Sequence, residues 1–184
     1  AIADTDTAIY YDRIGAPTTL DEFKARFGFD NTNDEATATY YNQADLGVGR
    51  EMHCRTTNDN PTGTGTACYV TNYGVDGSGQ PAFGGSASNA LRDAIARTNQ
   101  FATVAMWKDA GATGVDFVVF NDIGVRINQA PLDSQGFNTS IPNNCLNCHG
   151  GKYETTDVHV NGGAFLPFDP DAFLFSTRPN FTFE

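Results

Sequence analysis

Basic residues and long apolar runs are scarce in this sequence. Its 184 residues contain 11 Lys and Arg against 22 Asp and Glu, which gives a formal net charge of −11. Nucleic-acid binders carry basic surfaces that neutralise phosphates, so this composition argues against that class and against attachment to an anionic membrane surface. No run of about 18 apolar residues occurs, so the sequence predicts no helix that spans a bilayer.

Lysine is especially rare, and this shapes the expected fold. Only Lys24, Lys108 and Lys152 are present, whereas Thr, Asn and Gly are abundant. The composition therefore favours β-structure joined by long turns over a helical bundle. Fourteen Phe and seven Tyr supply bulk for a core, which disfavours intrinsic disorder. At this length we expect one domain over residues 1–184.

The hydrophobic patterns predict an α+β, β-rich fold. A capping box at residues 19–22 and a glycine at 28 bracket one helix, and a second helix is expected over about 88–99. Alternating runs predict six strands, at residues 36–41, 50–56, 67–73, 101–108, 116–121 and 125–128. We therefore expect an antiparallel sheet with two or three short helices and a turn-rich C-terminal segment that begins near residue 133.

The motif that carries chemistry lies in this C-terminal segment. Cys145, Cys148 and His149 form the C-x-x-C-H pattern of c-type haem attachment, within residues 143–151. Two thiols would add to the haem vinyl groups, and the next residue would present its imidazole to the iron. The alternatives are a thioredoxin-like redox pair, half of a zinc site or a plain disulfide, but neither a βαβ unit nor a second ligand pair accompanies the motif. We predict one covalent haem c with His149 as the proximal iron ligand.

The other two cysteines lie in neighbouring predicted strands. A Cys54–Cys68 disulfide across this hairpin would stabilise the fold by about 3 kcal/mol in the chain-entropy model, and two free buried thiols are the alternative. Haem c and a disulfide both indicate an oxidising compartment, so we expect a periplasmic or extracellular bacterial protein. The first residues, 1–4, lack Met and a basic signal region, which is typical of a mature terminus left after processing or of an artificial boundary.

The sixth coordination position of the iron has four candidate ligands, unless it is open: His53, His159, Met52 and Met106. His53 is the first choice because the neighbouring disulfide would hold it, and His159 is the second. Met52 and His53 point to opposite faces of an extended strand, so only one of them can reach the iron. Arg55 shares the face of His53 and is a candidate partner for a haem propionate.

Longer strings of the sequence resemble known proteins. DLGVGREMHC at 45–54, NCLNCHGG at 144–151 and FLPFD at 165–169 are similar to a group of secreted bacterial mono-haem proteins without assigned function. This resemblance supports pairing His53 with the haem. A haem motif in the last quarter of a β-rich chain also resembles, more loosely, the all-β c-prime-beta cytochromes, whose iron is open or binds ligands.

These observations predict a secreted mono-haem cytochrome that transfers electrons through a six-coordinate, bis-His haem rather than catalysing a reaction. Its acidic surface would attract redox partner proteins with a basic docking surface, and self-assembly is a further hypothesis. Two alternatives stay open, namely a haem enzyme or sensor of peroxide or nitric oxide with an open distal site, and a structural or filament-forming haem module. Residues 30–35 alternate oxygen side chains as calcium loops do but lack the Gly and Glu of such loops, which favours a polar turn.

Overall fold

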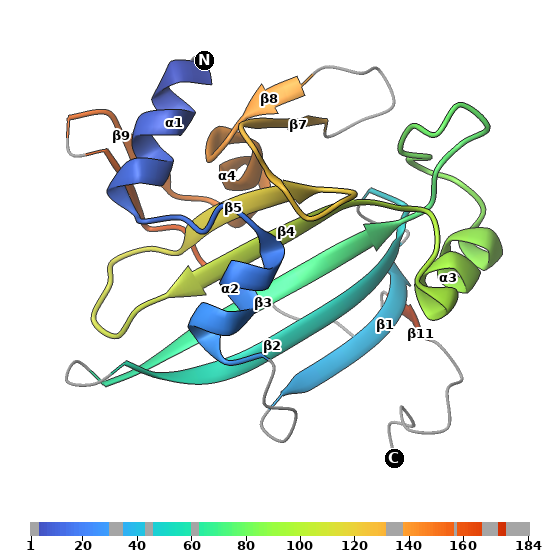
Figure 1. Cartoon of the computed structure of the whole chain (residues 1–184), viewed down its shortest axis with the longest axis horizontal. Coiled ribbons are helices and arrows are strands. Elements are labelled where there is room, and N and C mark those ends of the chain that lie inside the picture. Colours follow the sequence, from blue (N-terminus) through green and yellow to red (C-terminus); the bar gives the residue numbers. More distant parts are fainter. Residues whose placement is uncertain are drawn as a thin grey trace.

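The computed structural model describes residues 4–29, 35–42, 46–59, 63–131, 138–156, 158–166 and 173–175. The strands of its main sheet are β1 (Ala36–Asn42), β2 (Gly49–Asp59), β3 (Gly63–Tyr73), β4 (Gln100–Lys108), β5 (Asp116–Asn121), β6 (Arg126–Ile127) and β11 (Phe173–Phe175). They form one antiparallel sheet in the order β11-β1-β2-β3-β4-β5-β6 (Figure 1). The expected α+β, β-rich antiparallel architecture is therefore confirmed. Of the possible calcium loop, residues 30–34 lie outside the described part of the chain.

All six predicted strands are present in this sheet. The hairpin of β2 and β3 is its longest pairing and runs from Gly49 opposite Tyr73 to Asp59 opposite Gly63. The strands β4 and β5 pair as the predicted hairpin. The short strand β11 was not expected, and it adds to the outer edge of β1.

Four helices are found among the described residues, which corrects the expectation of two or three. They are α1 (Asp4–Arg13), α2 (Leu20–Phe27), α3 (Ala87–Ala96) and α4 (Asn143–His149). The capping box of α2 is confirmed, because the Glu22 amide donates to Thr19 Oγ1 at 3.2 Å and Gly28 ends the helix at φ 75°. The helices α1 and α4 escaped prediction because they are rich in Asp, Asn, Thr and Cys, which form helices weakly.

The two faces of the sheet are covered differently. On one face, α2 packs Phe23 and Phe27 against Trp107 of β4, with ring centroids 6.1 and 5.5 Å from the indole. The helix α3 lies close to β2, where a Cβ on Gly49 would stand 2.0 Å from the Ala90 carbonyl oxygen. Figure 1 shows α2 in front of the strands and α3 beside β1. We call this the packed face.

The helix α1 is bound to β5 through two tyrosine hydroxyls. The amide of Phe117 donates to Tyr10 Oη at 2.9 Å, and the amide of Val119 donates to Tyr11 Oη at 3.3 Å. The Thr7 hydroxyl also donates to the Ile141 carbonyl oxygen at 2.6 Å, just before α4. Thus α1 satisfies backbone amides of β5 and links this strand to the C-terminal region.

The C-terminal region contains more regular structure than the expected turns. Two small antiparallel pairs flank α4, namely β7 (Gln129–Pro131) with β8 (Asn138–Ser140) and β9 (Lys152–Glu154) with β10 (His159–Asn161). None of the helices in the described residues is both long enough and apolar enough to cross a bilayer.

Candidate functional site

The helix α4 brings the three residues of the C-x-x-C-H motif to one side. Cys145, Cys148 and His149 occupy positions i, i+3 and i+4, which neighbour one another on a helix surface. The start of α4 is anchored by the Asn144 side chain, whose Nδ2 donates to the Ala130 carbonyl oxygen at 2.7 Å. Cys145 is buried and Cys148 is exposed, and neither forms a disulfide. The motif is therefore presented by a fixed element.

The imidazole of His149 is held by a reciprocal contact with Ala164. His149 Nδ1 lies 2.8 Å from the Ala164 carbonyl oxygen, and the Ala164 amide donates to the His149 carbonyl oxygen at 3.2 Å. A carbonyl oxygen only accepts, so Nδ1 carries the proton and the lone pair of the ring is on Nε2. Orientation of a histidine through its other nitrogen is the usual arrangement for a metal ligand. This geometry prepares Nε2 to bind a metal.

The two glycines after the motif make this contact possible. Gly151 has φ 84°, and a Cβ at this position would stand 2.4 Å from the Gly163 nitrogen. Any other residue would push away the segment that carries Ala164. Gly151 therefore allows the contact that positions His149, and Gly150 before it also has a positive φ, 67°, at the end of α4.

A cavity of about 470 Å³ lies between α4 and the second face of the sheet, which we call the cavity face. This volume falls in the range of roughly 300–1,000 Å³ typical of ligand pockets. The sheet residues that line it recur with a period of two: Tyr40 and Asn42 of β1, Arg50, Met52 and Cys54 of β2, Thr66, Cys68, Val70 and Asn72 of β3, and Val104 and Met106 of β4. The opposite wall contains Asn144, Cys145, Cys148, His149, Phe165 and Leu166. Both motif cysteines and the histidine therefore face one mostly apolar cavity.

The environment of Cys145 separates the chemistries that its motif could serve. Burial raises the pKa of its thiol to about 12, and the neighbouring Cys148 adds to the effect. Disulfide exchange uses a thiolate, which this surrounding disfavours. Among the described residues, no three His, Cys, Asp or Glu side chains gather as they would around a metal ion. Two thiols, one oriented imidazole and an apolar wall together fit a covalently held haem.

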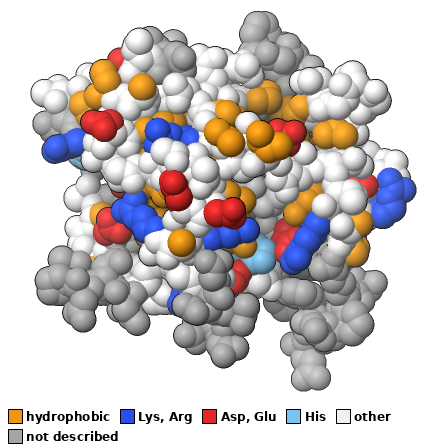
Figure 2. All heavy atoms as spheres, viewed as in Figure 1, with side chains coloured by type: hydrophobic (Ala, Val, Ile, Leu, Met, Phe, Trp, Pro, Cys, Tyr) orange, Lys and Arg blue, Asp and Glu red, His pale blue; other side chains and the backbone are white. Residues whose placement is uncertain are grey.

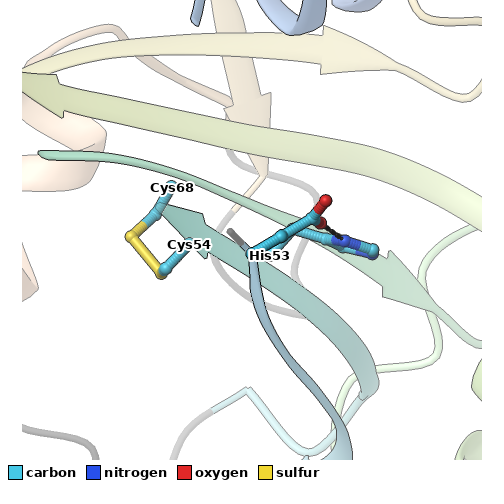
Figure 3. The surroundings of a disulfide bond; sticks show 4 residues. His53, Cys54 and Cys68 are labelled. Atoms are coloured by element: carbon cyan, nitrogen blue, oxygen red, sulfur yellow. Dashed lines mark hydrogen bonds and ion pairs between the residues drawn. A yellow bond between two sulfur atoms is a disulfide. The ribbon is translucent and has the colours of Figure 1, made fainter. Parts of the chain in front are cut away.

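His53, the first choice of distal ligand, is not among the residues that line this cavity. Its Nε2 lies 2.8 Å from Glu51 Oε1, its Nδ1 contacts Glu35 Oε1, and its ring stacks on Tyr69 at 4.5 Å. Figure 3 shows the His53 ring directed away from the neighbouring disulfide, which lines the cavity. The alternation of β2 places His53 on the packed face, with carboxylates at both ring nitrogens.

The second histidine candidate also lies away from the cavity. His159 belongs to β10 opposite Glu154 and is not among the residues that line the cavity. Its charge acts instead on Asp116, whose pKa it helps to lower against the larger effect of burial. The remaining candidates, Met52 and Met106, both line the cavity.

The expected propionate partner, Arg55, also lies away from the cavity. Arg55 lies on the packed face, where its guanidinium is 6.0 Å from the Phe29 ring and close to Gly28. Arg50 is the arginine that lines the cavity, because it shares the strand face of Met52. Sequence reasoning missed Arg50, although its spacing of two from Met52 is a signal that could have found it.

The disulfide between Cys54 and Cys68 is confirmed. It joins directly opposite positions of β2 and β3 (Figure 3). Both residues line the cavity. A disulfide is compatible with an oxidising compartment. All four cysteines of the chain therefore contact one cavity, two as a crosslink and two as thiols.

The surface of the packed face carries charges of both signs. Figure 2 shows acidic and basic side chains interspersed over this side of the molecule.

Comparison with protein-family models, curated proteins and solved structures finds no match to this chain. The chemistry of this protein therefore rests on the cavity and the motif.

Proposed function

We propose that this protein is a mono-haem c-type cytochrome that transfers electrons. Cys145 and Cys148 would hold the haem through thioether bonds, and His149 would be its proximal ligand. The observation that carries this proposal is the convergence of both thiols and the oriented imidazole on one apolar cavity. The bound iron would supply one-electron chemistry by cycling between its ferric and ferrous states.

The residues of the cavity have distinct tasks in this proposal. Val70, Val104 and Phe165 provide apolar walls that keep water from the metal, and burial of this kind is one of the means by which a protein sets a reduction potential. Arg50 supplies a positive charge for a haem propionate. The carbonyl of Ala164 fixes the ring of His149 and raises its basicity as a ligand.

The proposed location is the periplasm or the outside of a bacterial cell, supported by the disulfide and by the haem motif. The net charge of −11 favours a redox partner with a basic docking surface. Two residues that line the cavity are exposed, Cys148 and Leu166, the latter at 51%, so a partner could approach the motif there. Electron transfer to such a partner should slow as ionic strength rises.

The test is production of the full chain in a bacterial periplasm together with the c-type cytochrome maturation machinery. We expect haem that stays attached after denaturing electrophoresis, at one haem per chain, and a reversible one-electron titration. The Cys145→Ser/Cys148→Ser double variant should lose all covalent haem, whereas the matched packed-face variant His53→Gln should keep it. A wild-type protein without haem would overturn the proposal, and rapid turnover of peroxide or nitric oxide would favour the haem enzyme instead.

A further inference from the structure

The sheet wall of the cavity contains both methionines of the chain. Met52 of β2 and Met106 of β4 line it from the side opposite α4, which presents His149. A thioether is a soft donor that binds haem iron without losing a proton, so it suits an apolar cavity. Neither of the remaining histidines lines this cavity. The sheet therefore offers thioethers where the sequence predicted an imidazole.

The two methionines differ in their packing. Met106 is 7% exposed and belongs to the hydrophobic core, and its cross-strand neighbours are the disulfide residue Cys68 and the large side chain of Phe117. Met106 is thus already used in packing. Replacement of its contacts by a metal bond would disturb the core.

Met52 has no such role. It is half-buried, lies outside the hydrophobic core, and has the smaller residues Ala38 and Val70 as its cross-strand neighbours. Its long unbranched side chain therefore projects from between smaller neighbours into the cavity. The disulfide at Cys54, two residues along on the same strand face, ties this part of β2 to β3 and holds the Met52 backbone in place.

We propose that the sulfur of Met52 is the distal ligand of the haem iron, which makes the site six-coordinate with one histidine and one methionine. This inference rests on the proposed function. It predicts a reduction potential higher than that of a bis-His haem, because methionine ligation raises the potential. It also explains why His53, the next residue in β2, can bind the carboxylates of Glu35 and Glu51 and take no part in ligation.

The test compares three variants of the haem-loaded full chain, each a single substitution with similar volume: Met52→Leu, Met106→Leu and His53→Gln. Carbon monoxide binding to the ferrous protein, the spin state of the ferric protein and the methyl resonances of ¹³C-methyl-methionine are recorded for each. The wild-type protein should be low-spin and should not bind carbon monoxide rapidly. Because the chain has two methionines, one of two methyl signals should be shifted strongly by the porphyrin ring current, and this signal should disappear in Met52→Leu.

Met52→Leu should become high-spin and bind carbon monoxide stoichiometrically, while Met106→Leu and His53→Gln should keep the wild-type spectrum. Loss of the shifted signal in Met106→Leu instead would overturn the assignment to Met52. A haem-loaded wild type that is five-coordinate, or a Met52→Leu variant with an unchanged spectrum, would overturn it while leaving the cytochrome proposal intact. Absence of covalent haem from the wild type would overturn the proposed function and this assignment together.

Discussion

Neighbouring residues of the same strand have very different surroundings on the packed face and on the cavity face of the sheet. On the packed face, His53 contacts the carboxylates of Glu35 and Glu51, and Glu51 also pairs with Arg97, whose Nη2 lies 2.6 Å from Glu51 Oε1. On the cavity face, the adjacent Met52 lines an open apolar space. One residue step along β2 therefore separates a side chain used for the fold from one available for a ligand.

This difference shows how a sheet can stabilise the fold and still provide a binding wall. Helices α2 and α3 cover the packed face, whereas the short α4 covers only part of the cavity face. Substitutions on the packed face should therefore reduce stability, and substitutions on the cavity face should chiefly change the ligand. The predictions below test that division, from the largest expected effect to the smallest.

Truncation to alanine of one side chain on each face of β4 should give very different losses of stability. Trp107 on the packed face is 1% exposed and contacts Phe23 and Phe27, so Trp107→Ala should lower the free energy of unfolding by about 3–5 kcal/mol. Val104→Ala on the cavity face removes a half-buried side chain and should cost about 1 kcal/mol. Urea denaturation measures both, and equal losses would contradict the division between the faces.

Removal of the disulfide should give the next largest effect. The Cys54→Ser/Cys68→Ser double variant should be about 3 kcal/mol less stable to urea, because the crosslink restricts the unfolded chain across a separation of 14 residues. Covalent haem should remain, since Cys145 and Cys148 are unchanged. Reductant should lower the stability of the wild type by a similar amount and leave the variant unaffected. A variant as stable as the wild type would show that the crosslink serves only the cavity wall.

The smallest effect is the pH dependence that Glu51 gives to the packed face. Burial raises the pKa of Glu51, but hydrogen bonds from His53 and Arg97 outweigh it and lower the pKa to about 2. A carboxyl with a depressed pKa stabilises the fold above its unfolded pKa near 4.5, and this contribution is lost as the pH falls towards 2. Glu51→Gln should therefore cost about 1–3 kcal/mol at pH 7 and flatten the acid limb of the stability profile.

The control for this prediction is Asp122→Asn, which changes an exposed carboxyl outside the network. It should alter stability by less than about 0.5 kcal/mol at both pH 7 and pH 3. Urea midpoints at these two pH values, measured for both variants and the wild type, give the comparison. If Glu51→Gln lost as much stability at pH 3 as at pH 7, the carboxylate would not be the source of the acid sensitivity.

The sequence by itself determined the local features of this protein. The alternation of apolar residues located all six predicted strands, and the capping box with Gly28 located α2. The spacing of Cys145, Cys148 and His149 identified the motif, and the predicted hairpin identified the Cys54–Cys68 pair. Each of these depends on residues that are close in the chain or on directly paired strands, where covalent geometry and hydrogen bonding leave few arrangements.

Only the tertiary structure decided which face of the sheet meets the motif. Alternation along β2 showed that Met52 and His53 point to opposite faces of the sheet. Which of them faces the motif depends on where α4 and Ala164 lie, about 90 residues or more later in the chain. The same long-range packing places Arg50 at the cavity and leaves Arg55 and His159 outside its lining. Helix propensity could not foresee α4 either, since contacts such as Asn144 with Ala130 hold that short, weakly helical segment in place.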